Sequence, residues 1–145
     1  MTPQPVFTAC TLVATCSWAL LVFFPRKPRL VAVAGRLVPA ALAAAYCAII
    51  AAQWTRSEGG FGSLNAVALL FTNRWLLLAG WIHYLAFDLF VGAWMARDSQ
   101  HRGLPHPLLV PCLLLTFMFG PAGLLLYLAV SAMRAGRTRL AGTPA

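Results

Sequence analysis

Four stretches of this sequence are continuously apolar and about as long as a bilayer is thick. They cover residues 6–24, 37–54, 75–96 and 108–133. A bilayer core of about 30 Å needs about 20 apolar residues in an α-helix, whereas a barrel strand would alternate apolar and polar residues over about ten positions. The sequence therefore predicts an all-α fold. We expect one four-helix transmembrane bundle that occupies residues 1–145 as a single integral membrane domain.

Composition and charge agree with a membrane protein. Hydrophobic residues make up 61% of the chain and charged residues 10%, against about one half and one quarter in soluble domains. The net charge of +8 comes from bases in loops, at helix edges and in the tail, where cations meet lipid headgroups. These positions indicate membrane lipids, and not nucleic acid, as the partner. The four cysteines lie inside apolar runs without C-x-x-C spacing, which disfavours a thiol redox enzyme.

Local signals mark the ends of the expected helices. Pro25 ends the first run, and Asn73 is placed to cap the third. Between the second and third runs, apolar residues recur at helical spacing from Phe61 to Phe71, and Ser63 precedes them as a capping residue. This pattern predicts a short amphipathic helix at the membrane interface. A covering loop helix without its own function is the alternative.

The distribution of basic residues gives an expected orientation. The loop after the first run carries four bases, namely Arg26, Lys27, Arg29 and Arg36. By the positive-inside rule this loop is cytoplasmic, which places the N-terminus, and with four spans the C-terminus, outside. With four spans the two faces carry six and five Lys or Arg residues, so the orientation depends on the first loop. Residues 1–5 have no positive charge, and we therefore expect the first run to be a permanent helix.

The segment WIHYLAFDLF, residues 81–90, places an acid at the centre of the third run. Trp81, Tyr84 and Asp88 share one helix face, while His83 and Phe87 lie on a neighbouring stripe, with His83 about 140° from Asp88. A charged Asp in mid-membrane costs about 2.5–3.5 kcal/mol on insertion scales, so it faces the interior, finds a partner or stays protonated. We therefore identify Asp88, Tyr84 and His83 as candidate catalytic groups for proton transfer. A polar clasp between helices is the alternative.

The segment RDSQHRGLPHP precedes the fourth run. Asp98, His101 and His106, with His83, form a weak alternative as metal ligands. The chain has three histidines and no H-x-x-H or H-x-x-x-H box, which excludes a di-iron desaturase. We expect a solvated polar turn here and no metal.

The fourth run contains LTFMFGPAGLLLY. Pro121 removes a backbone donor and clashes with the carbonyl of Phe117, and Gly120 adds flexibility. We therefore expect a kink near the middle of this helix. A kink that faces the third helix would open space beside Asp88, although many membrane helices kink only for packing.

The sequences WIHYLAFDLFVGAWMARD, GLPH and PCLLLTFMFGPAGLLLY, in this order, resemble the signature of the neoxanthin-synthase-like family, the abscisic-acid-deficient-four type of small membrane protein. The resemblance implies a role in carotenoid or isoprenoid metabolism. It implies an isomerase that opens the epoxide of an oxygenated carotenoid by acid-base chemistry, without a cofactor. Asp88 would then donate a proton, and His83 or Tyr84 would accept or relay one. The residues expected to line the substrate slot are Trp81, Phe87, His106, Phe117, Gly120 and Pro121.

Two other classes stay open. One is a non-catalytic membrane protein that binds a carotenoid or lipid, or that acts as a scaffold. The other is a small transporter, which would need to form a homo-oligomer to enclose a path. The Ala- and Arg-rich composition and the lack of a transit peptide predict a bacterial protein of the inner membrane.

Overall fold

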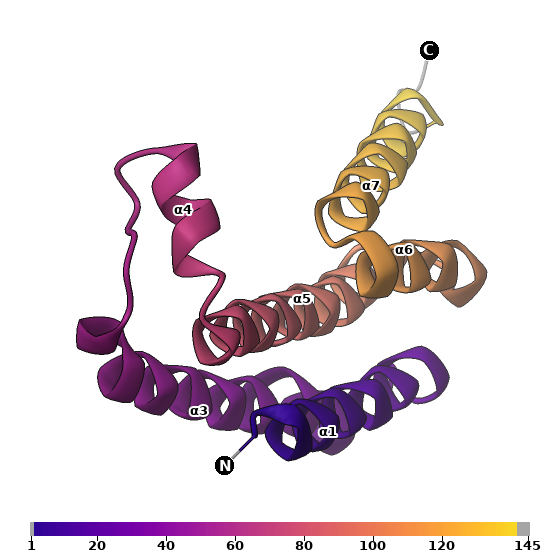
Figure 1. The fold of residues 1–145 in the computed structure, drawn as a ribbon. Helices are drawn as coiled ribbons and strands as arrows, with labels where there is room; N and C mark the ends of the chain where they lie inside the picture. Colours follow the sequence, from indigo (N-terminus) through magenta and orange to yellow (C-terminus); the bar gives the residue numbers. More distant parts are fainter. Residues whose placement is uncertain (1, 142–145) are drawn as a thin grey trace.

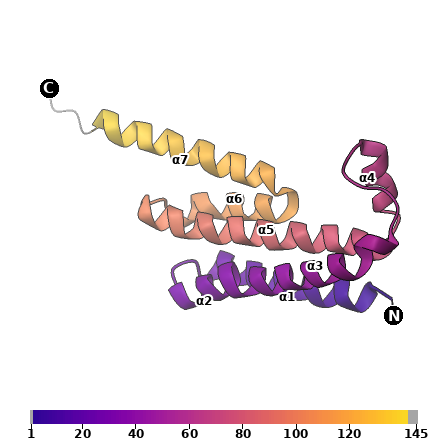
Figure 2. The same cartoon turned by 90° about the vertical axis from the view of Figure 1, so that its left-hand side faces the viewer.

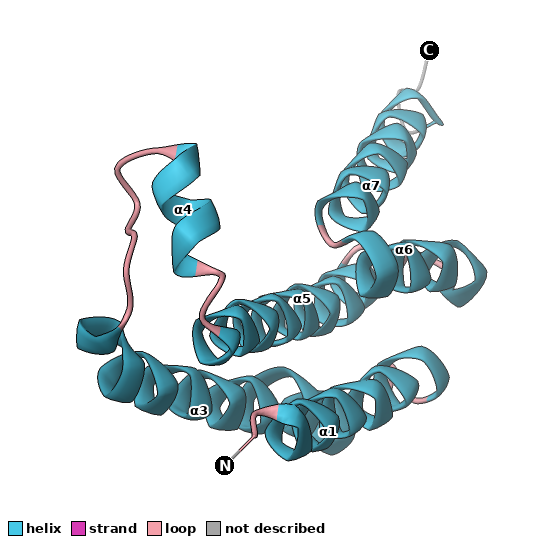
Figure 3. Ribbon diagram, viewed as in Figure 1, coloured by secondary structure: helices cyan, strands magenta, loops and turns pink. Residues whose placement is uncertain are grey.

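The computed structural model describes residues 2–141, and side chains as far as residue 136. The described chain is helical and contains no strand (Figures 1 and 3). Its α-helices are α1 (Gln4–Phe23), α2 (Pro28–Ala32), α3 (Val38–Gln53), α4 (Leu64–Leu70), α5 (Arg74–His101), α6 (His106–Phe119) and α7 (Pro121–Ala141), with a π-helical turn at Val33–Leu37 and a 3-10 turn at Trp54–Arg56. The all-α prediction is confirmed.

Three helices are long and apolar enough to cross a membrane: Gln4–Phe23, Pro28–Arg56 and Arg74–His101. The first and third agree with the expected spans, although the third continues five residues beyond Ala96. The second begins at Pro28 and not at residue 37. Pro39 has no N–H for the carbonyl four residues earlier, and the helix passes this point through the π-helical turn, where Val38 N bonds to Val33 O. A π-bulge thus lets one helix continue through a position where the sequence indicated a start.

Helix α5 is the centre of the bundle, with α1 and α3 on one side and α6 on the other (Figures 1 and 2). Small residues allow the close approach. A Cβ on Gly35 would lie 2.2 Å from the Cβ of Ala93, and a Cβ on Gly92 would lie 2.5 Å from the Trp18 ring. Such contacts are typical of membrane helices, where packing and not the hydrophobic effect holds helices together. The buried core here includes Trp18, Leu89 and Ala93.

The expected fourth span is wrong as a single helix. Residues 108–133 divide at Gly120 into α6 and α7, and α7 runs back beside α6 (Figure 2). Gly120 has a φ of 36°, which favours glycine, and Pro121 cannot continue the hydrogen bonding of α6. The predicted kink is therefore a reversal of chain direction. We call the pair the α6–α7 hairpin.

The short helix between the second and third spans is present as α4, which stands away from the bundle (Figure 1). Ser63 Oγ accepts a hydrogen bond from Ala66 N at 3.1 Å, and Asn73 Oδ1 accepts one from Trp75 N at 2.9 Å. Both predicted caps are therefore confirmed. Leu64 is 84% exposed and Phe61 72%, so much of the apolar surface of this segment is uncovered, although the Phe61 ring contacts Trp54 and Leu70 is buried. Its interfacial position stays a prediction.

Candidate functional site at the tip of the helical hairpin

The tip of the α6–α7 hairpin contacts the middle of α5. The hydroxyl of Tyr84 donates a hydrogen bond to the carbonyl oxygen of Phe117 at 2.9 Å. Phe117 is the residue four positions before Pro121, so its carbonyl is the one that the proline leaves without an N–H donor. A backbone carbonyl in an apolar interior needs such a donor. Tyr84 therefore satisfies the break in the helix, which explains one role for a hydroxyl at this position.

Asp88 lies against the same tip. A Cβ on Gly120 would lie 2.8 Å from Oδ1 and 2.9 Å from Oδ2 of this carboxyl group, so only glycine leaves room for it. Oδ2 is buried and has no hydrogen-bond partner among the described residues. A buried polar atom without a partner is costly. The structure thus brings Tyr84 and Asp88 of α5 against Phe117 and Gly120 of the hairpin tip, an arrangement that the sequence had left open.

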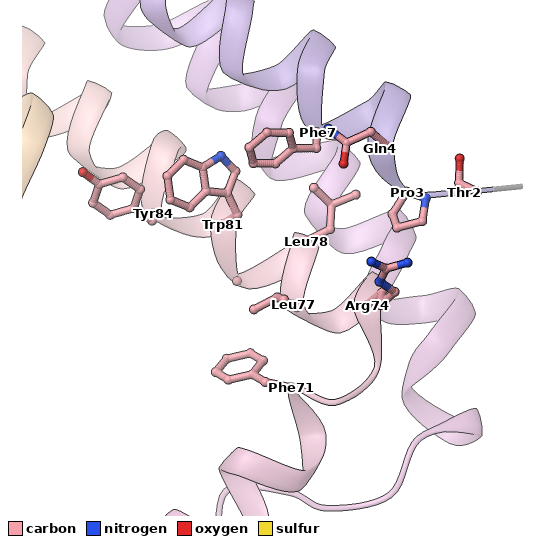
Figure 4. A pocket seen from close by; sticks show the side chains of 11 residues that line it. Thr2, Pro3, Gln4, Phe7, Phe71, Arg74, Leu77, Leu78, Trp81 and Tyr84 are labelled. Carbon is pink, nitrogen blue, oxygen red and sulfur yellow. The ribbon is translucent and has the colours of Figure 1, made fainter.

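A cavity of about 710 Å³ opens between the first turn of α1, the end of α4 and the first half of α5 (Figure 4). Three aromatic rings, from Phe7, Trp81 and Tyr84, follow one another along its wall; neighbouring centroids lie 5.6 and 5.3 Å apart. Gln4 and Arg74 lie at the other end. The cavity therefore extends from a polar end at Gln4 and Arg74 along apolar walls to Tyr84, one helical turn before Asp88.

Other predicted site residues lie elsewhere. The His83 ring contacts Phe87 and the Tyr46 ring of α3, with centroid distances of 4.6 and 5.8 Å. His83 and Phe87 are exposed, and neither lines the cavity. His106 is at the opposite end of α6 from the tip, beside a smaller cavity of about 230 Å³. The helical spacing had already separated His83 from Asp88, and the packing of α3 fixes that separation.

A family model described as ABA DEFICIENT 4-like matches residues 5–127. The chain belongs to this family. No curated protein and no solved structure matches it. The matched range contains the three spans of this ABA DEFICIENT 4-like protein, Tyr84, Asp88 and the hairpin tip, and it ends at Tyr127. Gln4, at the polar end of the cavity, lies just before the matched range.

A second polar cluster joins the hairpin of this ABA DEFICIENT 4-like protein to α5. Asp98 Oδ2 accepts hydrogen bonds from the Tyr127 hydroxyl at 2.7 Å and from Arg102 Nε at 2.5 Å. The bond to Asp98 and its negative charge raise the pKa of the Arg102 guanidinium. Trp94 makes an edge contact with the fully buried Tyr127 ring. The spacing of Asp98 and Arg102, i and i+4, could have suggested their pair; nothing in the sequence indicated Tyr127.

The residues of the weak metal alternative are not gathered at one place in the described structure. No group of three or more His, Cys, Asp and Glu side chains between residues 2 and 136 could hold a metal ion. Asp98 is engaged by Arg102 and Tyr127, while His101 is exposed. Asp98, His101 and His106 therefore do not form a metal centre.

Proposed function

We propose that this protein is a membrane-embedded acid-base isomerase of an oxygenated carotenoid or related isoprenoid, acting on an epoxide end group. Membership of the ABA DEFICIENT 4-like family supports the substrate class, through the resemblance described above. The geometry of the hairpin tip supports the reaction type. Opening an epoxide to an unsaturated alcohol changes neither composition nor oxidation state, so the chemistry requires only the movement of protons.

The observation that carries this proposal is Oδ2 of Asp88, which is buried without a hydrogen-bond partner in the described part of the chain and lies beside a cavity-lining tyrosine. A charged carboxylate with an unpaired oxygen in mid-membrane is disfavoured. A protonated Asp88 avoids this penalty and holds a proton that it can donate. A purely structural clasp would instead be expected to have both oxygens paired.

Tyr84 is placed between the cavity and Asp88, and we assign it the role of relay. In this proposal the Tyr84 hydroxyl turns from the Phe117 carbonyl to the bound substrate, donates its proton to the epoxide oxygen and takes the proton of Asp88. The carbon–oxygen bond next to the polyene breaks, and the neighbouring polyene carbon loses its proton, which returns through Tyr84 to the Asp88 carboxylate. Both residues regain their initial state, so atoms and electrons balance.

The cavity suits one end of a long amphiphilic molecule. Its volume of about 710 Å³ lies within the range of about 300–1,000 Å³ that is usual for small-molecule sites. Phe7 and Trp81 offer apolar ring faces to an end ring, and Gln4 and Arg74 at the polar end offer donors to a hydroxyl or oxo group. Trp81 Nε1 is already engaged with Thr11 Oγ1 at 3.1 Å, which fixes the orientation of this wall.

The test is conversion by purified protein in liposomes. Violaxanthin and related epoxides are supplied together with a chelator. The products are separated by chromatography, and their molecular masses are measured by mass spectrometry. We expect a new isomer of unchanged mass. Asp88→Asn and Tyr84→Phe should each reduce its formation by about 100-fold, the lower range of general acid-base contributions.

Matched controls separate chemistry from folding. Tyr46→Phe removes a hydroxyl from a tyrosine of α3, and Asp98→Asn removes a carboxylate from α5; both sites lie outside the proposed relay. We expect both control variants to convert the substrate at rates near that of the unchanged protein, per folded molecule. Full activity in a well-folded Asp88→Asn variant would contradict the proposed mechanism. Tight pigment binding without conversion across the panel would favour the non-catalytic carrier instead.

A further inference from the structure

The depth of the α6–α7 hairpin follows from its contacts with α5. Its tip, at Phe117 and Gly120, contacts Tyr84 and Asp88. Asp88 lies at the midpoint of the 28-residue helix α5. Because α5 is long enough to cross the bilayer, the tip lies close to mid-membrane. Helix α6 has 14 residues, about 21 Å at 1.5 Å per residue, which is shorter than the apolar core of about 30 Å.

The direction of α7 follows from two further contacts. Gly120 lies beside Asp88, and seven residues later Tyr127 bonds to Asp98. Helix α7 therefore runs parallel to α5 and returns toward the end where α6 began. Figure 2 shows the described end of α7 on the same side as α2 and the end of α5, while α4 and the N-terminus lie on the other side.

The close crossing within the hairpin is built into the sequence. A Cβ on Gly123 would lie 2.1 Å from Oγ1 and 2.2 Å from the backbone nitrogen of Thr116. Thr116 is itself fully buried and donates its hydroxyl to Cys112 O at 2.8 Å. Small residues at a crossing allow membrane helices to approach backbone to backbone. The hairpin is therefore a packed unit and not a bent single span.

We propose that the α6–α7 hairpin is re-entrant: it enters and leaves the bilayer at the face of the α1–α2 loop and gathers the basic residues there into one surface on the anionic cytoplasmic leaflet. The N-terminus is then outside and the end of α7 inside. This replaces the expectation of two external termini, which followed from a fourth complete span.

The charge distribution supports this arrangement independently of the contacts. With a re-entrant hairpin, the chain positions of nine of the eleven bases lie on one side of the membrane mid-plane: Arg26, Lys27, Arg29, Arg36, Arg97, Arg102, Arg134, Arg137 and Arg139. Arg56 and Arg74 are at the other face. Four complete spans would divide the same residues six to five, which gives the positive-inside rule little to act on. Nine basic residues against two give the positive-inside rule a clear direction.

The same face has a cavity suited to a lipid headgroup. About 230 Å³ in volume, it is lined by Phe23, Phe24, Pro25, Arg26, Lys27 and His106. Phe23 is 73% exposed, as expected for a ring that lies among acyl chains. Arg26 and Lys27, which follow it in the α1–α2 loop, are exposed as well. Cations next to aromatic rings at a helix end fit the junction between acyl chains and an anionic headgroup.

The decisive experiment asks which sites share a membrane face. Single cysteines replace Lys27, Gly60 or Gly136 in a chain whose four native cysteines are changed to alanine; a Cβ at Gly60 or Gly136 meets nothing within 4 Å. A membrane-impermeant maleimide is added to intact and to permeabilised cells. We expect positions 27 and 136 to react only after permeabilisation and position 60 to react in both. Reaction of 136 together with 60, and not with 27, would overturn the proposal.

Two further measurements complete the test. The first needs no substitution and so does not depend on the folding of a variant, and the second tests the lipid partner. The first fuses alkaline phosphatase or green fluorescent protein to the C-terminus of the unchanged chain; we expect fluorescence and no phosphatase activity, and the reverse result refutes a cytoplasmic end. The second places an environment-sensitive fluorophore at 136 or 60 in liposomes. Its emission should shift with added phosphatidylglycerol, in a salt-sensitive way, at 136 only. Equal shifts at both sites would overturn the leaflet assignment.

Discussion

The three long helices and the α6–α7 hairpin have similarly apolar sequences, yet they are held in different ways. The second span (Pro28–Arg56) and α1 pack on α5 at small residues: Gly35 of the π-helical turn meets Ala93, and Gly92 meets the Trp18 ring. The hairpin is interrupted at Gly120, and polar side chains of α5 join it to the bundle: Tyr84 bonds to Phe117 O, and Asp98 accepts from Tyr127.

This difference explains where the polar residues of the membrane region lie. A continuous helix needs no external donor, whereas a broken helix leaves carbonyls that need one. Tyr84 and Asp88 lie at the contact between the two regions. Oδ2 of Asp88, which has no hydrogen-bond partner among the described residues, lies there too. A helix break in the membrane therefore supplies both a structural need for polar groups and a place where they can do chemistry.

The strongest test of the hairpin is Gly123→Ala. The new methyl group would collide with backbone atoms of Thr116, as close as 2.2 Å, which cannot move aside. We expect a loss of about 3 kcal/mol, the upper part of the range for overpacked sites, and release of the hairpin from the bundle. Trypsin cleavage at Arg102 and Arg134 in detergent should become faster while the bundle stays intact. Gly136→Ala is the control. An unchanged cleavage rate would show that the crossing is not tight.

The matching test of the bundle is Gly35→Ala. Here the collision is with a side chain, the Ala93 methyl, at 2.2 Å. We expect about 2 kcal/mol of destabilisation and a lower melting temperature in detergent for the whole protein. Ala93→Gly should restore much of the loss in the double variant, because it removes the opposing methyl. If the two substitutions were simply additive, the contact would not be the cause.

Tyr84→Phe tests the junction between the two regions. It leaves the carbonyl of Phe117 without the Tyr84 hydroxyl, so we expect about 1–2 kcal/mol of lost stability, in addition to the loss of conversion. Hydrogen exchange should rise in α6 and α7 and not in α1. Tyr46→Phe is the matched control in α3. Exchange that rises equally in all helices would mean that the hydroxyl does not act at the hairpin.

The smallest effect is expected outside both regions. Ser63→Ala removes the side-chain cap that accepts from Ala66 N. We expect α4 to lose about 1 kcal/mol of local stability, while the melting temperature of the bundle stays the same because α4 stands apart from it. Hydrogen exchange of residues 64–70 is the measurement. A fall in the melting temperature of the bundle would show that α4 supports α5.

The sequence by itself determined the features that depend on neighbouring residues. Apolar length located the first and third spans and the end of the second, and Ser63 and Asn73 marked helix starts because a cap acts within three residues. Asp88 was recognisable because an acid in mid-membrane is costly wherever the partner lies. Pro121 marked a disturbance in the last apolar run because its missing N–H has a local effect.

The tertiary structure decided what that disturbance became. A proline leaves open whether a helix kinks or reverses; here Gly123 allows a backbone crossing at Thr116, and Tyr84, 33 residues from Phe117 along the chain, supplies the missing donor. The pairing of Asp98 with Tyr127 spans 29 residues in the same way. Such contacts depend on which helix faces meet, because they join groups that are near in space and distant in sequence, and no local pattern specifies them.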